Sequence, residues 1–188
     1  NFTKKYKEEL LDVAVPVRRA KDTLNVLVMN VEALSTSKGA GAALRFLELN
    51  PKSIMVVDES TTIKNRTASR TKTIIKCGER AKYSRILTGS PVTKSPMDLF
   101  TQCNFLSPEA LNFKSYFSFQ HRYAVMRKRT MGRKSFNEIV SFQRLEELSA
   151  KLDKFSTRVL KEDCLDLPAK VYVRRKVEMT TEQRKLYV

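Results

Sequence analysis

The stretch "SIMVVDESTTIKN", residues 53–65, decides how the rest of the chain is interpreted. Its four consecutive apolar residues, 54–57, have the length and continuous apolar character of a strand buried on both faces. The run ends on two adjacent carboxylates, Asp58 and Glu59. Ligands of open parallel sheets bind at the carboxyl ends of the strands, so this placement predicts a site for phosphate or metal chemistry. The alternative is an acidic turn that only caps the strand.

Similar apolar runs, separated by helical periodicities, surround this strand. Strands are predicted over 24–30, 84–91 and 169–179, and helices over 4–11, 41–50, 67–82, 96–106 and 142–156. Continuous apolar strands that alternate with helices predict an α/β fold with a parallel sheet flanked by helices.

The composition restricts the class of protein and of partner. Hydrophobic residues make up 41% of the 188 residues, which is enough for a packed core and excludes a disordered polyelectrolyte. The net charge of +16 favours a polyanionic partner, nucleic acid before a membrane surface. Three widely spaced cysteines, with no apolar run long enough to span a membrane, predict a cytoplasmic protein without disulfides or structural zinc.

A second polar turn follows another apolar run. In "LTGSP", residues 87–91, the small polar residues Thr88, Gly89 and Ser90 end the strand predicted one helix after Glu59. Hydroxyl groups there can hydrogen-bond to the acids or contact a phosphate, although an ordinary Ser-Pro turn is the alternative. Two polar turns at neighbouring strand ends favour one shared site.

In this order, these segments resemble motifs II and III of superfamily-two helicases, in particular the Swi/Snf family of DNA translocases. The resemblance is carried by "VLVMNVEAL" (26–34), "MVVDESTTIKN" (55–65), "RILTGSPV" (85–92), "DLFTQCNFLSP" (98–108) and "STRVLKEDCLDLPAKVYVRRKVEMTTEQRKLY" (156–187). The compact size and the "DEST" variant look most like phage or prophage members.

The resemblance implies a partial RecA-like (P-loop NTPase) lobe over residues 1–110. It also implies a mainly helical basic insertion over 111–156 that grips DNA, and a bridge over 157–188 toward a second RecA-like lobe. The implied cofactors are ATP and Mg²⁺, and the implied partner is double-stranded DNA. Asp58 would hold Mg²⁺ through water, Glu59 would be the general base, and residues 88–90 would couple the site to DNA.

The chain departs from the family pattern at two places. After the two acids, Ser60 and Thr61 replace the usual Ala-His. A threonine hydroxyl could replace the histidine's link to motif III, and the sequence leaves open whether Thr61 does so. Motif I, the phosphate loop, is absent, because neither "SKGAGAA" (37–43) nor "GRKS" (132–135) matches its Gly-Lys-Ser/Thr pattern. We expect motif I before residue 1 and the arginine fingers after residue 188, and no ATP turnover from the chain alone.

Two basic segments are candidate DNA contacts, with solvated loops as the alternative. Lys64, Asn65 and Arg66 follow the acids directly. A second group, interleaved with aromatic residues, contains Arg127, Lys128, Arg129, Arg133 and Lys134. The competing hypothesis for the whole chain is a non-enzymatic basic nucleic-acid-binding module whose acids only cap strands. A Gly-Lys-Ser/Thr loop in the flanking coding sequence would discriminate between the two.

Overall fold

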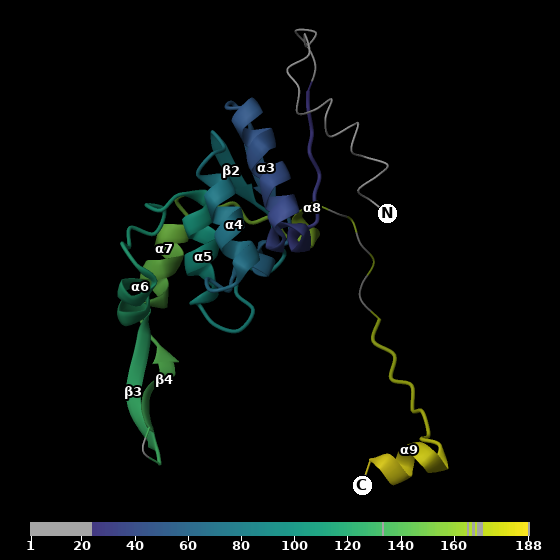
Figure 1. Ribbon diagram of the computed structural model, residues 1–188. Coiled ribbons are helices and arrows are strands. Elements are labelled where there is room, and N and C mark those ends of the chain that lie inside the picture. The colour runs from purple at the N-terminus through teal and green to yellow at the C-terminus, as the bar shows by residue number, and fades with distance from the viewer. Residues whose placement is uncertain (1–23, 133, 165, 167, 169–170, 188) are drawn as a thin grey trace. The chain divides into compact units, whose positions relative to one another are not determined.

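The computed structural model describes residues 24–132, 134–164, 166, 168 and 171–187. The chain divides into two units, Asn1–Phe155 and Ser156–Val188. Figure 1 shows the helices and strands of the described residues. The predicted helix over 4–11 lies outside the described residues. No helix of the described part is long and apolar enough to cross a membrane.

Two short strands form the parallel sheet of the first unit. Strand β1 (Ile54–Val57) pairs in parallel with β2 (Tyr83–Ile86), and helix α4 (Ser69–Gly78) connects them. The pairing runs from Ile54 opposite Tyr83 to Val57 opposite Ile86, so both strands end at the same edge. The predicted parallel, helix-connected pairing of these two segments is confirmed. The predicted burial on both faces is wrong, because Ile54 and Val56 are 55% and 49% exposed and only Val57 of β1 is buried.

The helices around this pair form the first hydrophobic core. Helix α3 (Ser37–Leu49) follows the 3₁₀ turn η1 (Val31–Ser35), and α5 (Asp98–Leu106) follows β2. Buried side chains from these elements and from the sheet pack together: Leu34, Ala43, Leu47, Val57, Ile63, Ile74, Cys77 and Phe105. The segment "SKGAGAA" lies in α3 and therefore forms no phosphate loop. A Cβ atom on Gly39 would lie 2.1 Å from the carbonyl oxygen of Ala33, so the packing of α3 against η1 requires glycine there.

The strand predicted over 24–30 is wrong. The segment alternates between exposed and partly buried residues as a strand would, and Met29 packs against the first core. No neighbouring strand in the described part pairs with it, so no ladder forms. Leu24, Val26 and Val28 are consequently left exposed.

The mainly helical insertion expected over 111–156 is also wrong. Helix α6 (Tyr116–Tyr123) leads directly into an antiparallel hairpin made of β3 (Ala124–Met131) and β4 (Lys134–Phe142), and α7 (Leu145–Leu152) follows. Gly132, at a φ of 61°, lies in the turn between the strands. Gly132 separates two runs that contain the β-branched residues Val125, Thr130, Ile139 and Val140, which is a hairpin signal, and the clustered cations obscured it.

A second hydrophobic core supports the hairpin at its base. Phe119 and Tyr123 are fully buried there, and they pack with Leu99, Leu111 and Leu148. Edge-to-face contacts between the rings, such as Phe113 on Phe119 with centroids 5.4 Å apart, add orientation to this core. The hairpin therefore starts from a rigid aromatic platform.

The second unit contains two short helices, α8 (Lys161–Cys164) and α9 (Thr181–Leu186). The start of α9 agrees with the sequence, because the Thr180 side chain accepts from the N–H of Gln183 and the Gln183 side chain accepts from the N–H of Thr180. The strand predicted over 169–179 is not present in the described residues 171–179.

Candidate functional site

The two acids lie at a sharp backbone reversal immediately after β1. Asp58 and Glu59 are both exposed, and the carboxylate oxygen Oδ1 of Asp58 accepts the N–H of Glu59 at 2.9 Å. Glu59 has left-handed backbone angles (φ 48°, ψ 60°), and the 3₁₀ turn η2 (Ser60–Ile63) starts directly after it. Such a conformation costs a residue with a Cβ about 1–2 kcal/mol. The surrounding structure therefore holds Glu59 in a strained position at the end of the strand.

The donor chemistry of Asp58 fits Mg²⁺. Its second oxygen, Oδ2, accepts no hydrogen bond from the described residues, and the residue as a whole is exposed. Mg²⁺ at nucleotide sites is held by one or two carboxylates, together with waters and substrate phosphates. No group of three His, Cys, Asp or Glu side chains in the described part forms an all-protein metal cage. A single accessible carboxylate is thus the arrangement that this class of site uses.

The hydroxyl-rich turn, residues 88–90, lies beside Asp58 and Glu59 because β1 and β2 end at the same edge of the sheet. Leu87 donates its N–H to Val57 and accepts the N–H of Ser60, both at 2.9 Å. Within the turn, Thr88 Oγ1 accepts the N–H of Ser90 at 3.2 Å, and Gly89 borders open space. In the described part of the chain, no hydrogen bond joins Asp58 or Glu59 to this turn. The structure therefore brings the two turns to the same edge of the sheet through backbone hydrogen bonds.

A buried glutamine connects the acid turn, residues 58–60, to the segment that follows β2. Gln102 on α5 is fully buried, and its Oε1 accepts the hydroxyl of Ser60 at 2.6 Å. Its Nε2 donates to the carbonyl oxygens of Pro91 at 2.7 Å and Asp98 at 2.8 Å. Ser60 and Pro91 lie on two different segments and Asp98 lies on α5 itself, so the Gln102 side chain fixes the spacing of the first two segments to α5.

The side chain that links the turn after β1 to the segment after β2 comes from Ser60 and not from Thr61. Thr61 makes no side-chain hydrogen bond to the turn after β2, and the link runs instead from Ser60 through Gln102 to Pro91. Sequence reasoning missed Gln102, although one signal was available. It lies three residues after Leu99 and three before Phe105, on the stripe that α5 buries. A glutamine on an apolar stripe indicates a buried hydrogen-bond partner.

Asp98 holds the loop between β2 and α5. Its Oδ2 accepts the N–H of Thr93 at 3.1 Å, the hydroxyl of Thr93 at 2.9 Å and the N–H of Lys94 at 3.0 Å. Burial by itself would raise the pKa of Asp98, but the hydrogen bonds from Lys94, Thr93 and Ser95 outweigh it and lower that pKa. Lys64 Nζ also donates to Thr93 Oγ1, which ties the segment after the acids to the same loop.

The first group of candidate DNA contacts borders an open pocket of about 220 Å³. Lys64, Asn65 and Arg66 line it together with Asp98 and Tyr116. The Arg66 guanidinium lies 4.6 Å from the ring centroid of Tyr116, an arrangement that orients the cation while it stays exposed. Asn65 is occupied locally, since its Oδ1 accepts the N–H and hydroxyl of Thr67.

The second group of cations lies on the hairpin. Arg127, Lys128 and Arg129 belong to β3 and Lys134 to β4, and all four are exposed. Arg129 pairs with Glu138 at 3.0 Å. Arg133 lies outside the described residues. The structure therefore places these cations on a β-hairpin. The sequence alone indicated only a basic loop or a helical insertion.

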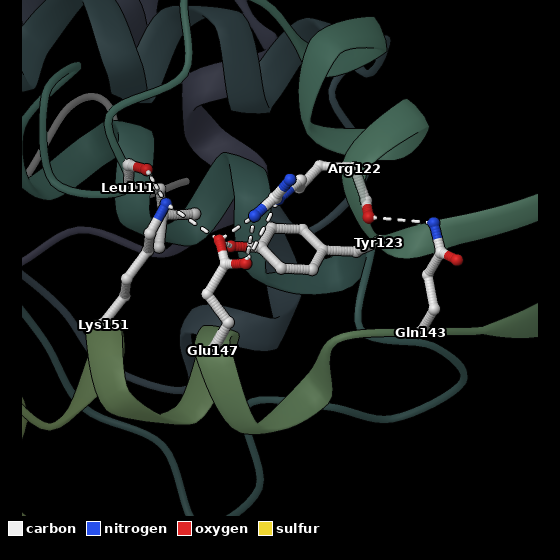
Figure 2. Close-up of polar contacts among 6 residues, drawn as sticks. All are labelled: Leu111, Arg122, Tyr123, Gln143, Glu147 and Lys151. Carbon is white, nitrogen blue, oxygen red and sulfur yellow. Dashed lines mark hydrogen bonds and ion pairs between the residues drawn. The ribbon is translucent and has the colours of Figure 1, made fainter.

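A polar cluster fixes the base of the hairpin to α7 (Figure 2). Arg122 contacts both carboxylate oxygens of Glu147, with its closest approach at 2.5 Å. The Tyr123 hydroxyl donates to Glu147 at 3.0 Å, and Lys151 lies 3.6 Å from the same carboxylate. Gln143 donates to the carbonyl oxygen of Arg122 at 3.2 Å. These four contacts lie at the base of the hairpin and fix the orientation of the hairpin relative to α7.

The Glu147 carboxyl is the charge centre of this cluster. The hydrogen bond from Arg122 lowers the pKa of Glu147, with further contributions from Tyr123 and Lys151 that outweigh burial. Burial and the bond to Glu147 raise the pKa of Tyr123 to about 12. The charged form of Glu147 and the neutral form of Tyr123 are thus the forms that the fold stabilises.

We expect Glu147→Gln to reduce the acid sensitivity of the fold. A lowered pKa means that the stabilisation is present above the ordinary carboxyl pKa of about 4.3 and is lost as the pH falls through the lowered pKa. Urea midpoints measured at about pH 6 and about pH 3.5 should differ less for Glu147→Gln than for the wild type. Glu146→Gln, one residue earlier and exposed, is the matched control and should behave as the wild type. Equal acid sensitivity of Glu147→Gln and the wild type would contradict the assignment.

Comparison with known proteins supplies the family. The family model that describes the SNF2-related domain matches residues 13–188. Mouse DNA annealing helicase and endonuclease ZRANB3 is 32% identical over 119 residues, which are 63% of this chain and 11% of that protein. The TATA-binding protein-associated factor MOT1 of Saccharomyces cerevisiae is 29% identical over 134 residues, 71% of this chain and 7% of that protein.

A further relative extends over more of the chain. The chromodomain-helicase-DNA-binding protein 3 homolog of Caenorhabditis elegans is 26% identical over 164 residues, 87% of this chain and 8% of that protein. No solved structure is a significant match. These three relatives are eukaryotic, and the resemblance to phage members stays a prediction. The chain spans only about a tenth of the length of each of them. Because the family model covers nearly the whole sequence, including both strand-end turns, the chain belongs to the family of SNF2-related domains.

Proposed function

We propose that the chain forms part of the first RecA-like lobe of an ATP-dependent DNA translocase or helicase of the SNF2 family. The observation that carries this proposal is the common edge of β1 and β2, where the acids and the hydroxyl-rich turn meet. In parallel sheets such an edge is where nucleotides bind. The family membership supports ATP as the nucleotide and duplex DNA as the partner.

Each residue at this edge has a distinct role in the proposal. Asp58 offers its free Oδ2 to Mg²⁺ through water. When bound with ATP, Mg²⁺ neutralises charge that develops on the phosphates. Glu59 is the general base, and its carboxylate accepts the proton of the attacking water. The exposed position of Glu59 at the strand end leaves this carboxylate free to face that water.

The hydroxyl-rich turn couples the nucleotide edge to DNA. Thr88, Gly89 and Ser90 follow β2 directly, and Gln102 holds both Ser60 and the carbonyl oxygen of Pro91. A movement of the acid turn on hydrolysis is therefore transmitted to the segment after β2 through one rigid side chain. Lys64, Asn65 and Arg66 follow η2 directly, line an open pocket together with Asp98, and provide the first DNA contacts in this proposal.

The remaining DNA contacts come from the insertion. Arg127, Lys128, Arg129, Arg133 and Lys134 bind phosphates in this proposal, and residues 1–110, 111–156 and 157–188 serve as motor lobe, DNA-gripping insertion and bridge. The phosphates of ATP need a glycine-rich loop, which the helical "SKGAGAA" does not supply. The proposal therefore requires such a loop elsewhere in the full-length protein.

ATP hydrolysis by the full-length protein tests the proposal. We expect turnover that depends on Mg²⁺ and rises when duplex DNA is added, as measured by phosphate release. DNA binding without any ATP turnover would contradict the motor assignment and favour a basic binding module. A rate of phosphate release that does not change when duplex DNA is added would contradict the coupling role of residues 88–90.

A further inference from the structure

The outer part of the hairpin has no packing partner. We define the distal hairpin as residues 127–131 and 134–138 of the two strands. Every described residue in it is exposed except Glu138, which is half-buried. Toward the base, by contrast, Ala124, Ile139 and Phe142 belong to the second core. The side chains of the distal hairpin are therefore accessible to a partner, while the base of the hairpin is anchored in the second core.

The two faces of the distal hairpin both carry free cations. Opposed residues share a face, and successive residues alternate between faces. One face holds the pairs Arg127–Glu138, Arg129–Phe136 and Met131–Lys134, and the other holds Lys128–Asn137 and Thr130–Ser135. Only Arg129 has a carboxylate partner among the described residues, so Arg127 and Lys134 on one face and Lys128 on the other are unpaired. A partner with negative charge on both sides of the ribbon would match this distribution.

Large apolar side chains are exposed on the first of these faces. Met131, next to the turn, is 73% exposed, and Phe136 is 46% exposed. Phosphate contact alone does not require either of them. Apolar side chains near the end of a cationic ribbon suit contact with the bases and thymine methyl groups that line a groove.

The dimensions of the distal hairpin also suit a groove. Its five residue pairs, from Arg127–Glu138 to Met131–Lys134, give a reach of about 13 Å at roughly 3.3 Å per residue. The major groove of B-DNA is about 12 Å wide and about 8.5 Å deep, and it admits a two-stranded ribbon. Phosphates form both of its walls, whereas a flat acidic surface or one extended strand would leave the cations of one face unused.

We propose that the distal hairpin inserts, turn first, into the major groove of duplex DNA. Arg127 and Lys134 contact the phosphates of one wall, Lys128 contacts those of the other, and Met131 reaches the bases. This inference rests on the proposed function, because duplex DNA is the partner in both. It adds the element, the groove and the orientation. The Glu147 cluster and the second core hold the base of the ribbon, so the ribbon arrives at the groove already ordered.

Salt-dependent affinity tests the two-sided contact. Lys128→Ala and Lys134→Ala should each lower the affinity of the protein for a fluorescent duplex, and each should reduce the slope of log affinity against log salt by about one. Lys52→Ala is the matched control, since this exposed lysine lies before β1 at the opposite end of the strand from the acids. The control should keep both affinity and slope. All three side chains are exposed, and thermal unfolding should show unchanged midpoints.

Groove-specific competitors test the location. Methyl green, which occupies the major groove, should displace the protein from the duplex, whereas netropsin, which occupies the minor groove, should not. Displacement by netropsin alone would overturn the groove assignment. A loss of affinity in only one of the two lysine variants would overturn the two-sided insertion.

The outcomes also separate this inference from the motor proposal. DNA-stimulated ATP turnover with wild-type affinity in the Lys128→Ala, Lys134→Ala double variant would overturn the hairpin inference and leave the motor standing. Reduced affinity and slope in both lysine variants, without any ATP turnover, would support the hairpin and contradict the motor.

Discussion

Glu59→Gln should lower the ATP turnover of the full-length protein by about 10²- to 10⁴-fold, the usual contribution of a general base. The amide has nearly the shape of the carboxylate but cannot accept the proton of the attacking water. Glu59 is exposed and its side chain makes no hydrogen bond within the described part of the chain. The fold and the affinity for DNA should therefore be retained, and phosphate release with a parallel binding assay would measure both.

The control for this change is Glu109→Gln, at an exposed position after α5 and away from the strand edge. It should turn over ATP as the wild type does. An unchanged rate for Glu59→Gln would show that another group takes the proton, and the assignment would fail. A joint loss of ATP turnover and DNA binding would point to a disturbed fold, which circular dichroism would detect.

Gln102→Leu should produce the largest loss of stability at the site. Leucine fills a similar volume but leaves the Ser60 hydroxyl and the Pro91 carbonyl oxygen without their partner. Each buried polar group left unsatisfied costs about 1–3 kcal/mol. We expect the melting temperature to fall by several degrees, at roughly 2–4 °C per kcal/mol for a domain of this size.

Two further variants make the Gln102 prediction specific. Gln143→Leu removes an exposed glutamine that donates a single 3.2 Å bond, and it should change the melting temperature little. Ser60→Ala combined with Gln102→Leu removes the stranded hydroxyl, so the double variant should be less destabilised than the sum of the single changes. Strict additivity would contradict a direct contact between the two side chains.

The elements that the sequence predicted well are those with strong local signals. The run at 54–57 is continuously apolar and the helix at 41–50 has clear helical periodicity, and the two appear as β1 and α3 within a few residues. The prediction of a strand over 24–30 is wrong because a strand needs a second strand to pair with. The local sequence pattern does not show whether such a strand lies beside it. The hairpin is not predicted by the sequence, because the clustered cations within residues 126–135 are compatible with a loop, a helix or a strand.

The site shows the same division between local and long-range information. Adjacent carboxylates after an apolar run located Asp58 and Glu59 at the strand edge, since chain neighbours stay neighbours in the fold. The contact of Ser60 with Gln102 spans 42 residues and depends on how α5 packs. Only the structure could choose between Ser60 and Thr61 as the residue that makes this link.

The left-handed backbone conformation of Glu59 means that the residue best for fold stability and the residue needed for the proposed activity differ at this position. Glycine adopts that conformation freely, and asparagine does so more readily than glutamate. A search for thermostable variants of this protein would accordingly select glycine or asparagine at position 59 and discard the carboxylate. In the proposed motor, the most robust form of the domain would be the one that no longer hydrolyses ATP.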